Sequence, residues 1–592
     1  MAYALLAVIL CGLIWRYPAA VILFPAWLFY GIAGLGLYYA QRRTWKRACE
    51  NNSDSRKQMP MIVSVRCMLL TVLTDCYGLA AGEDSFFLFD ILCCADGIAM
   101  VTDLVSRIKT AAALTGRPEK KRRKIPSFLR HPALYITLYI VMGALLPFLY
   151  QPGVSESTAE NVADTSFYSD EESGERATVL QDNGEALKER IRLISQAEEE
   201  IIMSTFEFDS DTSGRMMISA LMDAAGRGVQ VYVLVDGFSY LKEMWGNPYF
   251  LALAQTENVE VRIYNPIRPW KPWTFMGRMH DKYLIVDDLG YILGGRNTYD
   301  YFLGDQEGHK NYDWDVLVYS ADAGEDNSLE RVRDYFRSVW DQSVCRQLAD
   351  NHFWEKLPCV KTAGEELYEV SENMSAEYGD WFRSLDYERI TVPVNHIDLV
   401  SNPTNIFSKE PVVFYTGTEL MLRAEEEVVF HTPYTICNEW MLERLGEICQ
   451  EIDSVIMMTN SVANNGNPFG ASDYQLHKNE ILKTGVQILE YDGGTSYHGK
   501  CFVIDDRLSG IGSFNWDMRS TYVDTELMLV IDSEELNQQL REEMQEYEDD
   551  ALTVIDMDIS IAPDGTTEQE VNDGKKRLLQ ILEFFNWGRF IM

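Results

Sequence analysis

The sequence predicts two duplicated α/β lobes that form one catalytic unit and follow a helical transmembrane head. Three observations predict this fold class. The first 150 of the 592 residues are basic and largely apolar, the remainder is strongly acidic, and one motif occurs twice in that remainder. A chain of this length and apolar content builds several ordered domains rather than a disordered or disulfide-stapled one.

Charge is divided unevenly between the two parts of the chain. The net charge is −38 overall, and residues 1–150 hold 17 Lys and Arg against 9 Asp and Glu, which leaves −46 for the rest. Proteins that bind nucleic acid rely on Lys and Arg to neutralise phosphates. The acidic body therefore predicts that nucleic acid is not a partner, and it disfavours a nuclease.

The head, residues 1–150, holds four or five apolar segments. Residues 19–40 and 132–150 are long enough to span a bilayer, whereas 2–15 is short and fits either a tight first span or a re-entrant piece. Residues 61–106 are apolar but carry several charges, which cost free energy at a bilayer centre. They are expected to form either two weak spans or an amphipathic pair at the interface.

Two basic loops in the head predict its orientation. Residues 41–57 and 107–130 are rich in Lys and Arg, and the second loop contains nine of them with a single acid, Glu119. Short basic loops stay cytoplasmic. We therefore expect a multi-pass protein of the cell membrane, held by an anchor rather than a cleaved signal peptide, with an extracytoplasmic body.

Composition also sets the predicted domain boundaries. The stretch after the head is rich in Ser, Glu and Asp without an apolar period, which predicts a flexible linker. Residues 574–592 are amphipathic and are expected either to pack on the body or to lie at a membrane interface. The predicted order is a helical membrane domain, an acidic linker, a first lobe, a second lobe and a C-terminal segment, at residues 1–150, 151–185, 186–390, 391–560 and 561–592.

The acidic body is an internal duplication. Both copies fit the pattern H-x-K-x4-D-x6-G-[GS]-x-N, and every matched position is separated by 218 residues. Strands that alternate with helices around both copies predict two α/β lobes with parallel or mixed sheets. The flanking segments correspond in the pairs 197–208/424–434, 227–237/484–494 and 313–319/524–530. The last pair aligns Asp315 with Glu526.

The repeated residues suit phosphodiester chemistry. His280 and Lys282 are two positions apart on a strand, so their side chains point to the same side, and the second copy repeats this. If the lobes face each other across a pseudo-twofold axis, the paired groups can bind a phosphate, attack phosphorus and protonate the leaving oxygen. Neither a metal nor a cofactor is expected, because the other His and Cys residues lack ligand spacing. The candidates are catalytic His280, Lys282, Asp287, His498, Lys500 and Asp505; phosphate-binding Asn297, Asn515 and Ser513; and, to orient the imidazoles, Asp315 and Glu526.

The duplicated motifs resemble the phospholipase D superfamily, and bacterial cardiolipin synthases more closely. The resemblance is carried by MHDKYLIVDD and GGRNTYDYF in the first copy and by GSFNWDMRSTYVDTEL in the second. It implies phospholipase D-like lobes, a phospholipid substrate at a membrane, and phosphatidyl transfer through a phosphohistidine, which converts two phosphatidylglycerols into cardiolipin and glycerol. By analogy, His280 is the nucleophile and His498 the general acid and base. The chain departs from the family pattern at Asp281 and Asp524.

Three rival functions remain open at this point. A phospholipase D-type hydrolase would use the same residues with water as the acceptor. A superfamily nuclease is disfavoured by the acidic body, and an inactive lipid-binding scaffold by the intact His, Lys and Asn in both copies.

Two further features are ambiguous in the sequence. Segment 266–279 interleaves Arg and Lys with Trp and Phe, which fits either a membrane contact or a packed loop over the lobe interface. Cys345 and Cys359 could pair in an extracytoplasmic body, although reduced cysteines fit equally well. Cys501 is expected to face away from the site as a small buried residue.

Overall fold

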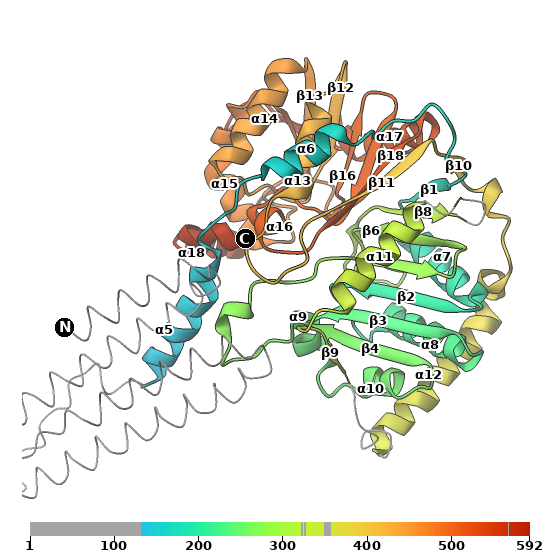
Figure 1. Cartoon of the computed structure of the whole chain (residues 1–592). Helices are drawn as coiled ribbons and strands as arrows, with labels where there is room; N and C mark the ends of the chain where they lie inside the picture. Colours follow the sequence, from blue (N-terminus) through green and yellow to red (C-terminus); the bar gives the residue numbers. More distant parts are fainter. Residues whose placement is uncertain (1–131, 321–323, 325–326, 349–356, 566) are drawn as a thin grey trace, which may run out of the picture. The chain divides into compact units, whose positions relative to one another are not determined.

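The structure is a computed structural model that describes residues 132–320, 324, 327–348, 357–565 and 567–592 (Figure 1). The apolar segments predicted at 2–15, 19–40 and 61–106 lie outside the described residues, as do both basic loops. The chain divides into two units. The smaller unit includes the described residues 132–147 and 268–273, and the larger unit holds the other described residues.

Helix α5 (Pro132–Leu145) belongs to the smaller unit, and a 3-10 turn, Leu146–Phe148, follows it. The Tyr139 hydroxyl donates a hydrogen bond of 3.2 Å to the carbonyl of Trp270 within this unit. Among the described residues, no helix combines the length and the apolarity that crossing a bilayer requires. The spanning helix predicted at 132–150 is therefore not supported.

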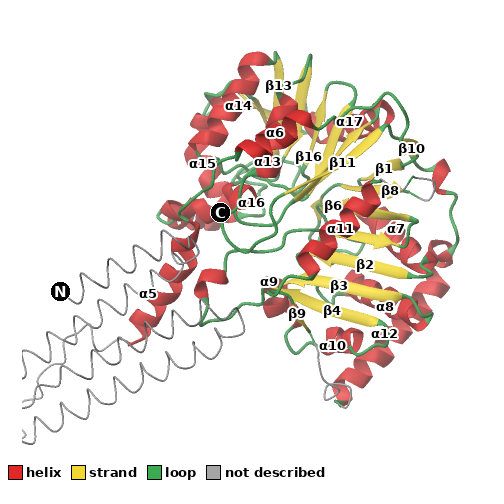
Figure 2. Ribbon diagram, in the orientation of Figure 1, coloured by secondary structure: helices red, strands yellow, loops and turns green. Residues whose placement is uncertain are grey.

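The larger unit contains two nine-stranded sheets (Figure 2). In each sheet three neighbouring strands run parallel and the others pair antiparallel. The first sheet contains, in spatial order, β10 (Val392–Pro393), β1 (Arg176–Leu180), β8 (Asp315–Tyr319), β6 (Gly290–Gly294), β5 (Tyr283–Val286), β2 (Glu200–Thr205), β3 (Gln230–Asp236), β4 (Val259–Tyr264) and β9 (Arg346–Gln347). The second contains β11 (His396–Ser401), β18 (Leu527–Asp532), β17 (Leu508–Gly512), β16 (Cys501–Ile504), β12 (Glu427–His431), β13 (Ser454–Asn460), β14 (Gln487–Tyr491), β19 (Ala551–Val554) and β20 (Ser560–Ile561). The strand patterns of the two sheets match from β1 to β9 and from β11 to β19, and β10 and β20 are additional edge strands.

Helices pack on each sheet and build a separate core with it. Most of them begin at an Asp, Asn or Ser whose side chain accepts a backbone N–H of the first turn, such as Asp182, Asp211 and Asn438. The helices that share a core with the first sheet are α7 (Asn183–Gln196), α8 (Thr212–Gly226), α10 (Pro248–Ala254) and α12 (Pro358–Glu377). Those that share a core with the second are α13 (Val412–Met421), α14 (Glu439–Glu451) and α15 (Pro468–Leu482).

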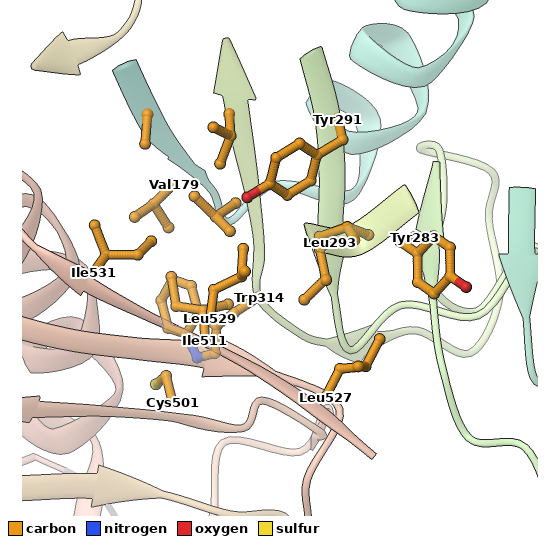
Figure 3. Packing of buried hydrophobic residues seen from close by; sticks show 14 of the residues in the cluster. Val179, Tyr283, Tyr291, Leu293, Trp314, Cys501, Ile511, Leu527, Leu529 and Ile531 are labelled. Atoms are coloured by element: carbon orange, nitrogen blue, oxygen red, sulfur yellow. The ribbon is translucent and has the colours of Figure 1, made fainter. Parts of the chain in front are cut away.

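A third core joins the two lobes. Helix α11 (Ser328–Trp340) of the first lobe contacts β11 of the second, and α17 (Glu534–Asp549) of the second lobe contacts β1 of the first. Figure 3 shows the residues of this shared core, with Val179, Leu293 and Trp314 from the first lobe and Ile511, Leu529 and Ile531 from the second. Because apolar residues of both lobes are buried together, the lobes form one folded body, and the predicted pair of α/β lobes is confirmed.

The predicted flexible linker at 151–185 is wrong. Strand β1 belongs to the first sheet, between β10 and β8, and helix α6 (Glu156–Asp164) precedes it. Val162 and Phe167 are buried, and Phe167 joins the core of the second lobe. Scattered apolar residues in an acidic stretch are enough to dock it, although its average composition suggests disorder. The first lobe therefore begins at β1 and the second at β11, instead of at 186 and 391.

One predicted strand correspondence is also wrong. The strand order places β3 opposite β13 in the duplication, and β14 opposite β4. The alignment of 227–237 with 484–494 matched β3 with β14 instead. Both parallel strands follow a helix and a Gly turn, so their local sequences look alike even though their positions in the sheet differ.

Candidate active site

His280 is held by an acid from the opposite lobe. It follows Met279, which forms an isolated parallel bridge with Thr525 of the second lobe. The His280 backbone N–H donates to Thr525 Oγ1 at 3.2 Å, and Nδ1 lies 2.9 Å from Glu526 Oε1. When Glu526 is ionised, its carboxylate accepts this hydrogen bond, so Nδ1 carries the proton and Nε2 keeps its lone pair. Phe206 packs edge-on against the ring, with centroids 5.1 Å apart.

His498 is likewise held by an acid of the opposite lobe, although Lys500 Nζ also lies 2.6 Å from its Nδ1. It follows β15 (Ser496–Tyr497), which pairs with β7 (Asn311–Tyr312) of the first lobe, and its backbone N–H donates to the Tyr312 carbonyl at 2.6 Å. Its Nδ1 lies 2.6 Å from Asp313 Oδ2, and Phe302 packs edge-on at 5.0 Å. Each histidine thus receives its acid from the other lobe, and neither half-site is complete alone.

Asp313, and not the predicted Asp315, contacts His498. Asp315 is fully buried, and its Oδ2 lies 2.9 Å from Arg190 and 3.1 Å from Arg296. It holds the first lobe together through these two guanidinium groups. The proposed orienting role of Asp315 is therefore wrong, whereas Glu526 lies where the sequence predicted an orienting acid.

The strand register explains the error. In the first sheet Gly294 pairs with Asp315, and in the second sheet Gly512 pairs with Met528. The acid that contacts a histidine stands two residues before the paired residue in both lobes. The sequence alignment was two residues out of register, and a strand's alternation cannot reveal such a slip because its period is also two.

A buried lysine lies beside each histidine. The Lys282 ammonium donates to the His280 carbonyl, and the Lys500 ammonium to the His498 carbonyl. Burial lowers the pKa of Lys282 to about 7 and that of Lys500 to about 8, although nearby carboxylates oppose the shift. Each lysine also acts electrostatically on the other lobe's histidine, so the two half-sites share one electrostatic environment.

The pKa of each histidine is depressed. Burial, reinforced by Lys282, holds the pKa of His280 well below its usual value. Burial and then Lys500 lower the pKa of His498 to about 4, while its carboxylate partner opposes the shift. Both imidazoles are therefore neutral near pH 7 in the free protein, which is the state a nucleophile requires.

The two orienting acids differ in their electrostatics. Burial raises the pKa of Glu526 to about 7, against the opposing charge of Lys282. Burial also acts to raise the pKa of Asp313, but Lys500 and His498 outweigh it and the net shift is downward. Asp313 is therefore an ionised partner at neutral pH, whereas Glu526 lies near its midpoint.

The two asparagines of the repeat are buried close to backbone and hydroxyl groups. Asn297 Oδ1 accepts the Glu207 N–H at 3.2 Å, and Asn515 Nδ2 donates weakly to Ser520 Oγ at 3.4 Å. Asn515 Oδ1 has no hydrogen-bond partner within the described part of the chain. The Asn297 oxygen is thus occupied, which turns its amide N–H groups toward other acceptors such as a phosphate.

Ser513 forms a hydrogen bond with the orienting acid Glu526. Its hydroxyl donates to Glu526 Oε2 and accepts the Leu527 N–H at 3.1 Å. Ser520 donates to the other oxygen, Glu526 Oε1, at 2.6 Å. The predicted phosphate-binding role of Ser513 is therefore wrong, because its hydroxyl is already used on both sides.

Asp287 and Asp505 do not belong to the site. Each follows its strand at the end opposite the histidine, and four strand residues span about 13 Å. Both have left-handed backbones, with φ of 47° and 50°, which Asp tolerates better than most residues. Their carboxylates accept the backbone N–H groups of residues 198–200 and 425–427. The predicted catalytic role of these two aspartates is wrong, because they fix the entry into β2 and β12.

The sequence did not predict two further buried charged residues, Asp281 and Lys409. Asp281 accepts from Thr525 Oγ1 at 2.6 Å and from the Tyr335 hydroxyl at 3.0 Å, and burial raises its pKa to about 7. Lys409 is buried, and its ammonium has no hydrogen-bond partner among the residues described. Burial lowers the pKa of Lys409 to about 8 against the opposing charge of Asp524. Asp281 was visible as a departure from the family pattern, whereas Lys409 lies in a loop without a motif.

The basic segment before His280 ends in a packed loop. Arg278 is buried, lies 3.4 Å from Asp236 and donates to the Asn265 carbonyl at 2.9 Å. Its backbone N–H donates to Asp524 of the second lobe at 3.2 Å. Of the two alternatives for this segment, residues 274–279 follow the packed one.

Neither a metal centre nor a disulfide is found in the part of the chain that the structure describes. No group of three or more His, Cys, Asp or Glu side chains there could hold a metal ion. Cys345 and Cys359 are free. Cys501 is buried in the core that joins the lobes, as predicted.

Comparison with protein families assigns most of both lobes. The family model described as "Cardiolipin synthase, PLD-like domain" matches residues 190–340 and 418–547. These ranges include both histidines, both lysines and both orienting acids. The match thus covers the geometry described above and not merely the sheets around it.

The chain is also similar to individual proteins. Cardiolipin synthase C of Escherichia coli K12 is 26% identical over 402 residues, which cover 61% of this chain and 82% of that protein. An uncharacterized protein of Helicobacter pylori strain 26695 is 24% identical over 412 residues, 63% of this chain and 79% of that protein. The crystal structure of a phosphatidylserine synthase from Haemophilus influenzae has the same fold, with a TM-score of 0.53 at 15% identity, over 74% of this chain and 99% of that one.

Proposed function

We propose that this chain, which belongs to the phospholipase D superfamily and is a cardiolipin synthase-like phosphatidyltransferase, joins two phosphatidylglycerols into cardiolipin and glycerol. One observation carries the proposal. Each half-site has a histidine held by an acid from the other lobe, with a buried lysine beside it. Two imidazoles and two ammonium groups are what a double displacement at a phosphodiester requires.

The first step transfers phosphatidyl to the protein. The lone pair of His280 Nε2 attacks phosphorus, a P–N bond forms, and the P–O bond to the glycerol headgroup breaks. His498 delivers a proton to the departing glycerol oxygen. The phosphate anion between the lysines adds negative charge, which raises the pKa of His498 and allows it to carry that proton. Asp313 then stabilises the imidazolium.

The second step returns the phosphatidyl group to a lipid. A glycerol hydroxyl of another phosphatidylglycerol gives its proton to the now neutral His498 and attacks phosphorus. The P–N bond breaks, which regenerates His280, and cardiolipin leaves. The phosphate charge is met by Lys282, Lys500 and the Asn297 amide throughout, so neither a metal nor a cofactor is part of the proposed mechanism.

The proposed enzyme works at a membrane. The apolar run at 19–40 and the basic loops at 41–57 and 107–130 support a multi-pass anchor in the cell membrane with an extracytoplasmic body. Cysteine placed at exposed Glu160, in a Cys359→Ser background, tests this topology. Labelling by an impermeant reagent on intact cells is expected, and protection until the cells are permeabilised would put the body on the cytoplasmic side.

The decisive assay is a product analysis. Purified full-length protein is incubated with isotopically labelled phosphatidylglycerol, and lipids are resolved by mass. Equal amounts of cardiolipin and glycerol are expected. Phosphatidic acid with glycerol would identify water as the acceptor and hence a hydrolase, and unchanged substrate would contradict both activities.

A further inference from the structure

The C-terminal segment turns an apolar face outward. It consists of α18 (Asp573–Glu583) and a 3-10 turn, Asn586–Ile591. Residues at intervals of three lie on neighbouring positions of a helix surface. A group of large exposed apolar side chains marks an interaction site more often than single ones do. This apolar face consists of Leu578, Ile581, Phe584, Phe585 and Trp587, which are 41%, 58%, 77%, 44% and 60% exposed.

The exposure does not come from a loose tail, because the segment is fixed on its inner side. Arg589 makes two hydrogen bonds of 2.8 Å to Asp473 on α15, and Asn586 donates to the same carboxylate at 2.8 Å. The Lys575 ammonium donates to two backbone carbonyls at 2.8 Å. Leu579 is buried. The helix therefore holds its outer face in a defined orientation.

The charges around the face distinguish it from the rest of the body. Lys576 and Arg577 are exposed and form no ion pair within the described ranges. Segment 573–592 has four Lys and Arg against two acids, Asp573 and Glu583, whereas residues 151–592 carry a net charge of −46. Trp and Phe with neighbouring Lys and Arg suit the boundary between acyl chains and anionic headgroups.

The end of this segment is bonded to the active-site region. The Arg519 N–H donates to the Met592 carbonyl at 2.9 Å, and its guanidinium donates to the Ile591 carbonyl at 3.2 Å. Arg519 also pairs with Asp524 at 2.7 Å. Asp524 accepts the backbone N–H of Arg278, two residues before His280. A short bonded chain thus joins the apolar face to the loop that carries a catalytic histidine.

We propose that this apolar face is a docking surface for an anionic lipid bilayer, which it contacts with Phe584 and Trp587 while Lys576 and Arg577 meet the headgroups. The proposal rests on the proposed function, since the substrate of that reaction lies in a bilayer. Docking here would hold the body against the lipid surface and present the His280 loop to headgroups.

A photocrosslinker tests which molecule covers the face. Full-length protein with benzoylphenylalanine at Phe584 is reconstituted into vesicles of phosphatidylglycerol and phosphatidylcholine, irradiated and examined by mass. A lipid adduct is expected at Phe584 and none at Tyr368, which is 62% exposed on α12. An adduct to the protein's own chain, an adduct to a second copy, or reaction with water alone would each overturn the proposal. This readout needs no turnover, so it stands apart from failure of the proposed reaction.

A kinetic comparison adds a functional readout. The variant Phe584→Ser/Trp587→Ser should raise the apparent KM for vesicle lipid about tenfold, since a loss near 1.4 kcal/mol of interfacial binding is a factor of ten. Its kcat, and its rate on a dispersed short-chain phosphatidylglycerol, should stay unchanged. The control Tyr368→Ser should match the parent on both substrates. An unchanged KM on vesicles would count against docking through this face.

Discussion

The two half-sites share a backbone plan but differ in what surrounds each histidine. The strand register makes Ser204 the equivalent of His431, since they pair with Tyr283 and Cys501, which are 218 residues apart. The same offset relates Met279 to Tyr497. In the first half-site the Ser204 hydroxyl lies 3.3 Å from the Met279 sulfur. The second half-site has the His431 imidazole and the Tyr497 phenol at these two positions.

The second half-site contains a buried hydrogen-bond network. His431 Nδ1 lies 2.8 Å from the Tyr497 hydroxyl, and its Nε2 lies 3.0 Å from Glu548. The Trp314 indole donates to the same hydroxyl. Tyr497 directly precedes His498, and Trp314 directly follows Asp313. The hydrogen bond between Trp314 and Tyr497 therefore stabilises the positions of both the histidine and its acid. In both half-sites the histidine thus contacts an acid from the other lobe, but of the residues that the structure describes, only those of the second half-site form this additional hydrogen-bond network.

This difference suggests that the two histidines have different roles, proton transfer for one and nucleophilic attack for the other. His498 has an ionised, braced carboxylate, which suits a group that must repeatedly gain and lose a proton. His280 has instead a carboxyl partner near its midpoint, and its ring, like that of His498, is neutral in the free protein, as a nucleophile requires. The assignment of His280 as nucleophile remains a prediction, which the following variants test.

The largest effect is expected from the histidines themselves. His280→Ala and His498→Ala should each lower kcat by about 10²–10⁴-fold or more, since each removes a nucleophile or a proton carrier. With a phosphatidyl substrate whose leaving group needs no protonation, His498→Ala should accumulate phosphohistidine at His280. Intact-protein mass measures the adduct. Accumulation in His280→Ala, with none in His498→Ala, would reverse the assignment.

The acids should respond unequally. Asp313→Asn removes an ionised partner, so a fall in kcat of about 10²–10⁴-fold is expected. Glu526→Gln keeps a hydrogen-bonding side chain where the carboxyl lies near its pKa of about 7, so a fall of about tenfold is expected at pH 7. Single-turnover kinetics on both variants make the comparison. Equal losses would show that the two acids do the same work, against the asymmetry argued above.

The sequence predicted the paired lobes, both histidines, both lysines and Glu526, because these follow from a motif repeated at one offset. It failed at Asp313 because a two-residue slip preserves strand parity, and at β1 because four buried residues stand within an otherwise acidic stretch. Asp287 and Ser513 were misplaced for another reason. A repeated residue can be kept for a turn or for a hydrogen bond to an acid, and spacing alone does not separate these roles from catalysis.

The lysines should set an alkaline limit on the rate. A lysine is charged below its pKa, so kcat/KM should fall as pH rises through about 7 and again through about 8, where Lys282 and then Lys500 lose their protons. Lys500→Arg keeps the charge at higher pH and should remove the fall near pH 8 while the fall near pH 7 remains, even if the absolute rate is lower. The pH profile of kcat/KM provides the measurement. Lys478→Arg, at a buried pair with Glu490 2.9 Å away, is the matched control and should leave the limit in place.

The smallest effect is expected where the two halves agree. Asp287 and Asp505 each accept three backbone N–H groups at the same place in their lobes, with nearly equal φ angles. Alanine at either should lower the free energy of unfolding by about 1–3 kcal/mol, because amide groups lose their acceptor and a left-handed residue becomes less favourable. Asparagine keeps an acceptor and tolerates that backbone, so it should cost less. Denaturant unfolding provides the free energies, and kcat per folded molecule should be retained in all four variants. A loss of kcat without a loss of stability would show that these aspartates act in catalysis. Clearly unequal losses of unfolding free energy at the two positions would show that the two lobes differ in structural stability as well as in chemistry.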